Sequence, residues 1–173
     1  MKRVMIIGCP GSGKSTLARA LAAKTGLPLY CLDLMYWNPD RTIKPKEEFR
    51  AELRRVLSLD EWIIDGNYGS TLELRMEACD TVIFLDYPLE VCLSGVEERR
   101  GKPRPDMPWV ETEPDPEFIE FIKKYNEESR PTVIELLEKY NEKNVIIYRL
   151  LQQKAGPRNG GDRSRHRQRD RSV

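Results

Sequence analysis

The sequence is poor in residues that bind metals or form disulfides. Its 173 residues include one histidine and four cysteines. The cysteines are Cys9, Cys31, Cys79 and Cys92. They are spaced too widely for a zinc site and three of them lie in apolar runs, so we expect reduced thiols in the core or in loops. His166 lies in an arginine-rich stretch and is not expected to bind a metal.

Long apolar runs are also missing. No stretch approaches the roughly 18 apolar residues of a membrane span, and the apolar run in residues 1–7 is too short for a signal peptide. We therefore expect a cytoplasmic protein that does not enter a membrane. The length suits one domain with a substantial core and is short for two domains.

Charge is nearly balanced over the chain but unevenly distributed. The formal net charge is +1, yet residues 157–173 carry six arginines and two aspartates, a local charge of +4, which leaves −3 for the rest. The tail has almost no apolar residues and cannot offset the entropy lost on ordering. We predict a folded domain over residues 1–150 and a basic, disordered tail over residues 151–173. The tail could contact nucleic acid or an acidic surface, or be an inert extension.

Strand-like and helix-like patterns alternate along the first 150 residues. Apolar runs predict strands at residues 3–7, 27–33, 61–66, 81–88 and 144–150. Helical spacing predicts helices at residues 14–25, 45–57, 70–77, 89–100 and 118–140, the last one bent or broken at Pro131. This alternation predicts an α/β fold with a parallel sheet covered on both faces. Residues 101–116 hold five prolines and no periodic pattern, which predicts a functional loop or lid.

A phosphate-binding motif follows the first predicted strand. Residues 8–15, GCPGSGKS, match G-x-x-x-x-G-K-[ST] between a strand and a helix, which is the context that the motif requires. The loop directs its N–H groups at phosphates, the catalytic Lys14 would reach the β- and γ-phosphates, and Ser15 would bind Mg²⁺. The predicted nucleotide contacts in this loop are Gly8, Pro10, Gly11, Ser12, Gly13, Lys14, Ser15 and Thr16.

Other classes that use this loop carry motifs that the sequence lacks. A GTPase would show N-K-x-D, which does not occur. Motor and clamp-loader ATPases would show an acidic D-E pair after an apolar strand, but Asp65 is followed by Gly66 and Asp86 by Tyr87. Small P-loop kinases remain, and these move a γ-phosphoryl group onto a bound small molecule.

With these motifs the chain resembles the nucleotide and shikimate kinase group, and within it the FlaR-like proteins described as DNA topology modulation proteins. The resemblance covers residues 1–148 and is carried by GCPGSGKSTLA, LYCLDLMYW, EWIIDGNY, DTVIFLDYP, RRGKPRPDM and SRPTVIELLEKY. It implies a three-layer α/β/α P-loop NTPase fold with a five-stranded parallel sheet in the order 2-3-1-4-5, a short mobile lid at about 101–116, and ATP as the nucleotide. The D-G-N-Y segment lacks the proline and arginine of the D-G-F-P-R in adenylate kinases, which counts against an ordinary AMP acceptor.

Two aspartates follow predicted parallel strands, at the edge where such sheets bind ligands. We assign Asp65, with Ser15, to the Mg²⁺ site and Asp33 to the acceptor or to general-base catalysis. The reverse assignment remains open, as does a helix-capping role for Asp33. A structural hydrogen-bonding role is expected for Asp86.

Further candidates surround the expected acceptor. Gly66, Asn67 and Tyr68 form a loop that could hold it, and Arg75 could bind an acceptor anion. Trp37 could line its pocket and Trp109 could cover it, whereas Trp62 is expected in the core.

Arginines flank the predicted lid. Arg99, Arg100 and Arg104 could stabilise charge on the transferring phosphoryl group when the lid closes, Arg100 by contacting the nucleotide. The alternative is a solvated basic helix end. Arg130 resembles an arginine that faces the lid and the phosphates or substrate in shikimate and adenylate kinases, which implies a catalytic role.

Together these features predict a monomeric or weakly dimeric kinase that uses ATP and Mg²⁺ and phosphorylates a small-molecule or nucleotide acceptor. The alternative from another class is an ATP-binding regulatory protein linked to DNA topology, with the tail as the contact with nucleic acid. The acidic charge of the body argues against DNA binding by the folded part.

Overall fold

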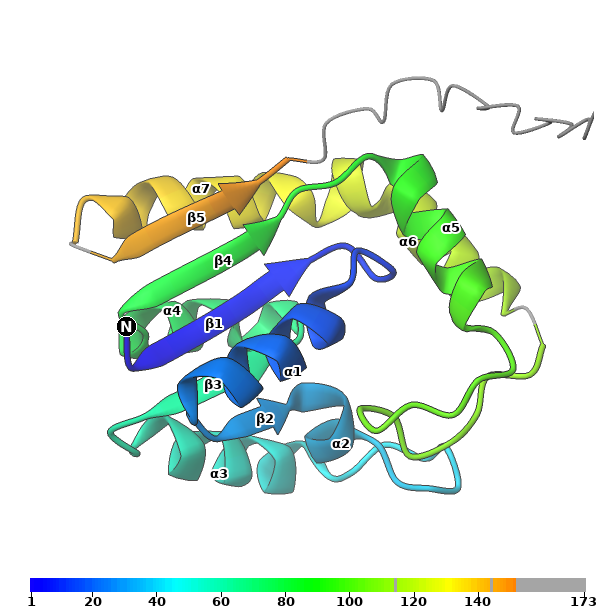
Figure 1. Ribbon diagram of the computed structural model, residues 1–173, viewed down its shortest axis with the longest axis horizontal. Coiled ribbons are helices and arrows are strands. Elements are labelled where there is room, and N and C mark those ends of the chain that lie inside the picture. The colour runs from blue at the N-terminus through cyan, green and yellow to red at the C-terminus, as the bar shows by residue number, and fades with distance from the viewer. Residues whose placement is uncertain (114, 144, 152–173) are drawn as a thin grey trace, which may run out of the picture.

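The computed structural model describes residues 1–113, 115–143 and 145–151. They form an α/β fold around a five-stranded parallel sheet (Figure 1). The strands are β1 (Arg3–Gly8), β2 (Leu29–Cys31), β3 (Trp62–Asp65), β4 (Thr81–Leu85) and β5 (Ile146–Leu150). Their order across the sheet, β2-β3-β1-β4-β5, confirms the predicted order 2-3-1-4-5. The predicted basic tail lies, apart from Leu151, outside the described residues.

The helices agree closely with the predicted alternation. They are α1 (Lys14–Thr25), α2 (Leu32–Tyr36), α3 (Lys46–Leu57), α4 (Leu72–Ala78), α5 (Leu89–Arg99), α6 (Pro116–Glu128) and α7 (Arg130–Asn141), with a single 3₁₀ turn η1 (Gly69–Thr71) before α4. No helix in residues 1–113, 115–143 or 145–151 is long and apolar enough to cross a membrane.

The second strand is shorter than predicted. β2 ends at Cys31, and the chain turns at once into α2, which holds Asp33 in its first turn. Leu32 and Met35 explain the turn, because their spacing of three residues in a helix places both side chains in the core. The prediction of a strand through Asp33 was therefore wrong, although Asp33 still follows the carboxyl end of a parallel strand.

The long helical pattern near the end of the chain breaks as predicted. α6 ends at Glu128 and α7 begins at Arg130, with Ser129 between them. Pro131 lies in the first turn of α7, where a missing N–H group costs no hydrogen bond.

Alternate residues of the central strand pack on opposite faces of the sheet. Val4 and Ile6 contact Ala18 and the other apolar residues of α1 on one face. Met5 and Ile7 pack on the other face with apolar residues of α3, α4 and α7. β1, β3 and β4 are almost entirely buried, as expected for parallel strands covered on both faces.

α5 and α6 lie beyond the carboxyl ends of the strands, not over a face of the sheet (Figure 1). Cys92 and Val96 of α5 pack with Ile122 and Tyr125 of α6, and Cys9 of the phosphate loop joins this cluster. The segment that links the two helices contains no helix or strand among its described residues, 100–113 and 115. Together these elements enclose the sheet edge where the phosphate loop lies.

Candidate active site

The phosphate loop packs its backbone directly against α5. Gly11 has a φ of 82°, and a Cβ atom there would lie 2.0 Å from the carbonyl oxygen of Cys92. A Cβ atom on Gly95 would lie 2.1 Å from the carbonyl oxygen of Gly11. Glycine is therefore required on both sides of this contact, and α5 holds the loop in place. Gly8 links the phosphate loop to the loop after β3, because its N–H donates to Oδ1 of Asn67 over 2.9 Å.

Lys14 begins α1 and places its ammonium group inside the loop. Its Nζ donates to the carbonyl oxygen of Cys9 over 3.0 Å. Burial lowers the pKa of Lys14, while the nearby carboxylates of Asp65 and Asp33 oppose this shift. The ammonium is thus removed from bulk water and held where the oxygens of a bound phosphate would become its partners.

Asp65 ends β3 and faces Lys14. Its side chain is almost fully buried, and its Oδ1 has no hydrogen-bond partner among the described residues. Burial raises the pKa of Asp65, while Lys14 and a hydrogen bond from Ser15 lower it. An orphaned carboxylate oxygen beside a serine hydroxyl is a fitting pair of donors for Mg²⁺.

The protein would supply only a few of the ligands of a bound Mg²⁺ ion. Within the described parts of the chain, no group of three or more histidine, cysteine, aspartate or glutamate side chains could hold a metal ion. Mg²⁺ keeps several waters and takes further oxygens from the phosphates of its nucleotide. Ser15 and Asp65 would be the protein's share.

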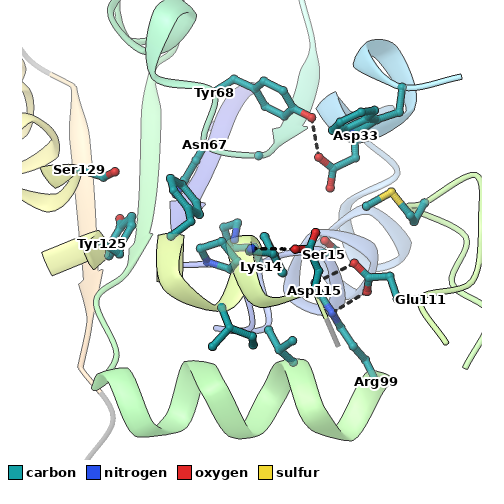
Figure 2. Close-up of a pocket in the computed structure, with 18 of the residues that line it drawn as sticks. Lys14, Ser15, Asp33, Asn67, Tyr68, Arg99, Glu111, Asp115, Tyr125 and Ser129 are labelled. Atoms are coloured by element: carbon teal, nitrogen blue, oxygen red, sulfur yellow. Dashed lines mark hydrogen bonds and ion pairs between the residues drawn. The ribbon is translucent and has the colours of Figure 1, made fainter. Parts of the chain in front are cut away.

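Asp33 pairs with an aromatic hydroxyl on the other side of the site. The hydroxyl of Tyr68 donates to Oδ1 of Asp33 over 2.7 Å (Figure 2). Burial raises the pKa of Tyr68 and the charge of Asp33 raises it further, so that this hydroxyl keeps its proton. Asp33 lies in the first turn of α2, whose N-cap residue is Cys31.

The two lid arginines Arg99 and Arg104 are held by carboxylates. Nε of Arg99 lies 3.1 Å from Glu111, and both residues appear in Figure 2. Arg104 contacts Glu111 at 3.4 Å and Asp106 at 3.1 Å. Burial, followed by the charge of Arg104, lowers the pKa of Arg99. Both guanidinium groups are thereby fixed beside the phosphate loop.

Asp106 also connects the lid to α1. Its buried carboxylate accepts a hydrogen bond of 2.7 Å from Arg19. Neither Arg19 nor Asp106 was predicted from the sequence. Arg19 follows Ser15 by four residues and therefore shares its helix face, a signal that could have identified it. Asp106, one of several acids in an irregular segment, offered no such signal.

Two cavities meet at the phosphate loop. The smaller, of about 130 Å³, is lined by Gly11, Gly13, Lys14, Ser15, Thr16, Arg19, Gly95, Arg99, Arg104 and Asp106. The larger, of about 1040 Å³, shares Lys14, Ser15, Arg99 and Arg104 with it and extends to Asp33 and α6. The predicted residues Pro10, Asp65, Gly66, Asn67, Tyr68, Trp37, Arg100 and Trp109 line the larger cavity as well. Most of the predicted site therefore converges on one space, while Gly8 and Ser12 line neither cavity.

Trp109 covers the cavity as predicted. Its ring meets that of Trp37 edge to face, with 5.4 Å between the ring centroids, and this contact brings the lid onto the residue that follows α2. The guanidinium group of Arg41 lies 5.9 Å from the centroid of the Trp109 ring. Trp62 is fully buried in the core, again as predicted.

Arg75 does not reach the cavity. It is fully buried, and it donates to the carbonyl oxygens of Gly66 at 2.7 Å, Tyr68 at 3.1 Å, Thr71 at 3.2 Å and also Asn67. Burial lowers its pKa, but a guanidinium group remains charged. The prediction that Arg75 binds the acceptor was therefore wrong. Its guanidinium instead fixes the backbone of the loop from Gly66 to Tyr68 by hydrogen bonds to the loop's carbonyl oxygens.

Arg130 also lies away from both cavities. Its Nε and Nη2 donate to the two oxygens of Asp86 at 2.8 and 2.9 Å, and Arg149 binds the same carboxylate. Burial opposes ionisation of Asp86, but the hydrogen bonds from both arginines outweigh it and lower its pKa. Asp86 has the predicted structural role, whereas the catalytic role predicted for Arg130 does not fit, because this ion pair occupies it.

The chain is similar to one family model and to solved kinase structures of low sequence identity. A family model described as ATPase family associated with various cellular activities (AAA) matches residues 4–86, less than half of the chain. No curated protein is significantly similar in sequence. A solved shikimate kinase from Bacteroides thetaiotaomicron is 20% identical, with a TM-score of 0.49 over 86% of this chain and 85% of that one. A deoxyadenosine kinase from M. mycoides with bound dATP is 16% identical, with a TM-score of 0.46 over 87% of this chain and 90% of that one.

The phosphate loop and the strand order identify the fold independently of these comparisons. A G-x-x-x-x-G-K-[ST] loop joins the central strand β1 to α1, in a parallel sheet of order 2-3-1-4-5. This is the P-loop NTPase fold, whose loop binds nucleotide phosphates.

Proposed function

We propose that the protein is a kinase that uses ATP and Mg²⁺ to phosphorylate a small-molecule or nucleotide acceptor. One observation carries the proposal: Lys14 and Ser15 of the phosphate loop line the same cavity as Asp33. Among the described residues, the carboxylate of Asp33 has no ion pair with a basic side chain. A triphosphate on the loop and an acceptor beside Asp33 would therefore meet in one partly enclosed space, as phosphoryl transfer requires.

The nucleotide end would hold the triphosphate by backbone and by charge. The loop amides and the N-terminus of α1 would bind the phosphates, with Lys14 on the β- and γ-phosphates. Ser15 and Asp65 would hold Mg²⁺, which would neutralise phosphate charge when bound. Arg19, Arg99 and Arg104 line the smaller cavity and would add positive charge there.

The acceptor end would activate the attacking group. If the acceptor is a hydroxyl compound, the carboxylate of Asp33 would take its proton as the new O–P bond forms and the bond from the γ-phosphorus to the bridging oxygen breaks. Tyr68 would orient the carboxylate through its hydrogen bond. The lid, held down by the contact between Trp37 and Trp109, would exclude water that could otherwise hydrolyse ATP.

Several finer predictions belong to this proposal. ATP as the preferred nucleotide, a cytoplasmic location and a monomer or weak dimer are consistent with the fold. The alternative of a regulatory protein linked to DNA topology depends on residues 157–173, which lie outside the described part of the chain.

ADP formation by the purified protein with Mg²⁺ tests the proposal, across nucleosides, nucleoside monophosphates and small hydroxy acids. We expect at least one acceptor to raise turnover well above basal hydrolysis, and Lys14→Ala to abolish the increase. Mass spectrometry should find the phosphorylated acceptor. ATP binding without any acceptor-stimulated turnover would contradict a kinase, and would direct attention to partners of the nucleotide-bound state.

A further inference from the structure

Two arginines that were candidates for the site are engaged elsewhere in the protein. Arg75 donates to backbone carbonyl oxygens, and Arg130 is paired with Asp86. These were the two arginines predicted at or near the acceptor, and both point to partners outside the cavity. These two guanidinium groups are therefore not available to bind an anionic acceptor.

The remaining cations of the large cavity gather at its phosphate end. Lys14, Arg99 and Arg104 also line the smaller phosphate cavity, where ATP would engage them. Arg100 is paired with Glu97, which leaves Arg41, an exposed residue beside Trp109. With ATP bound, the acceptor end would thus have one exposed guanidinium group available for an anion.

Acidic side chains also line the larger cavity. They include Asp33 and, from the end of the lid and from α6, Glu113, Asp115 and Glu128. None of the last three has an ion pair with the cavity's own cations among the described residues. A phosphate or carboxylate placed here would face side chains of the same charge. Repulsion between like charges discriminates strongly between charged and uncharged ligands. The cavity therefore favours an uncharged acceptor.

Aromatic rings flank the cavity on two sides. Trp37, Tyr68 and Trp109 line it from the end of α2, the loop after β3 and the lid. Phe118 and Tyr125 line it from α6. Such rings stack well on planar ligands, and a volume of about 1040 Å³ leaves room for a ring and its attached groups.

From this juxtaposition of an aromatic-lined cavity, acidic residues that are not paired with the cavity's own cations, and occupied arginines, we infer that the acceptor is an uncharged hydroxyl compound with a planar ring, of the nucleoside class. The inference rests on the proposed kinase function and narrows it. The hydroxyl proton passes to Asp33, the hydroxyl oxygen bonds to the γ-phosphorus, and ADP leaves with the electron pair of the broken bond. The product is a phosphate monoester.

Matched acceptor pairs test the inference. Adenosine, guanosine, cytidine and thymidine would each be assayed against their 5′-monophosphates, together with a hydroxy acid that has no aromatic ring, all with ATP and Mg²⁺. We expect the best nucleoside to exceed its monophosphate in kcat/KM by about tenfold or more, because the acidic side chains of the cavity repel the phosphate. Partial screening by solvent limits the size of this effect. A preferred monophosphate or hydroxy acid would overturn the inference and leave the kinase standing. If no acceptor stimulates turnover, the kinase proposal fails and this inference fails with it.

A charge variant gives an independent readout with a matched control. Glu128 lines the cavity, whereas its neighbour Glu127 does not. We expect Glu128→Lys to reduce the preference for nucleoside over monophosphate several-fold, and Glu127→Lys, with the same change in net charge, to leave it unchanged. Equal effects of the two variants, or none from Glu128→Lys with both variants folded, would contradict an acidic acceptor site.

Discussion

The two ends of the active site are built in different ways. The phosphate end is built around one continuous stretch, from Gly8 to Thr16, with Arg19, Arg99 and Arg104 beside it. The acceptor end is assembled from side chains of α2, the loop after β3, the lid and α6, which are far apart in sequence. A generic function can thus be encoded in a short motif, while specificity depends on how distant elements pack.

Removal of Lys14 is the strongest way to break the phosphate end. Lys14→Ala deletes the ammonium group that would follow the γ-phosphoryl group, so we expect kcat to fall by about 10⁴-fold. The fold should survive, since α1 buries its core face through Ala18. Measurement of single-turnover phosphoryl transfer and of thermal unfolding separates the two effects. A variant that keeps more than a tenth of the activity would contradict the assigned phosphate site.

Asp33 is the corresponding test of the acceptor end. Asp33→Asn keeps the size of the side chain and removes its ability to take a proton, so we expect kcat to fall by about 10³-fold while ATP still binds. Titration calorimetry with a non-hydrolysable ATP analogue provides the binding control. Equal loss of nucleotide affinity would instead place Asp33 at the metal, which is the reverse assignment.

The lid arginines line both cavities, and Arg104 tests their contribution. Arg104→Ala removes a guanidinium that lines both cavities, so we expect kcat to fall by about 10²-fold. Lys102→Ala is the matched control, because Lys102 is an exposed cation of the same segment that lines neither cavity. Steady-state kinetics of the two variants should differ clearly. Equal losses would indicate that the general charge of the lid matters more than its geometry.

Tyr68 gives the smallest expected effect and the finest comparison. Tyr68→Phe removes only the hydrogen bond to Asp33, so we expect kcat to fall by about tenfold or less and ATP affinity to stay the same. Steady-state kinetics and an ATP titration measure the two quantities. A fall in kcat as large as that of Asp33→Asn, or a loss of ATP affinity, would contradict this limited role of Tyr68.

The sequence predicted a parallel sheet and the phosphate loop because both follow from local patterns, whereas the strand order 2-3-1-4-5 was implied by the resemblance to the nucleotide and shikimate kinase group. Apolar runs that alternate with helical periods specify parallel strands and their covering helices, and the loop motif is contiguous. Asp33 and Asp65 could be identified from their positions after strands. The early end of β2 could not, because it depends on how Leu32 and Met35 pack in the core.

The arginines show where sequence reasoning stops. Arg75 and Arg130 have the right residue type near the right elements, yet the structure directs one at carbonyl groups and the other at Asp86. Nothing in the spacing of a guanidinium reveals which acceptor group it finds after folding. Asp106 was missed for the same reason, since its value lies in a contact with Arg19, which is 87 residues away.

The most direct test follows the γ-phosphoryl group itself. The wild-type protein, Lys14→Ala and Asp33→Asn would each be incubated with ATP labelled at the γ-phosphate, Mg²⁺ and the nucleoside that best stimulates turnover, or the full acceptor panel. We expect the label to appear on a hydroxyl of the acceptor with the wild-type protein, and neither variant to transfer it at a comparable rate. Label that appears only as inorganic phosphate, with every acceptor and in all three proteins alike, would contradict the claim that both ends of this site serve one transfer reaction.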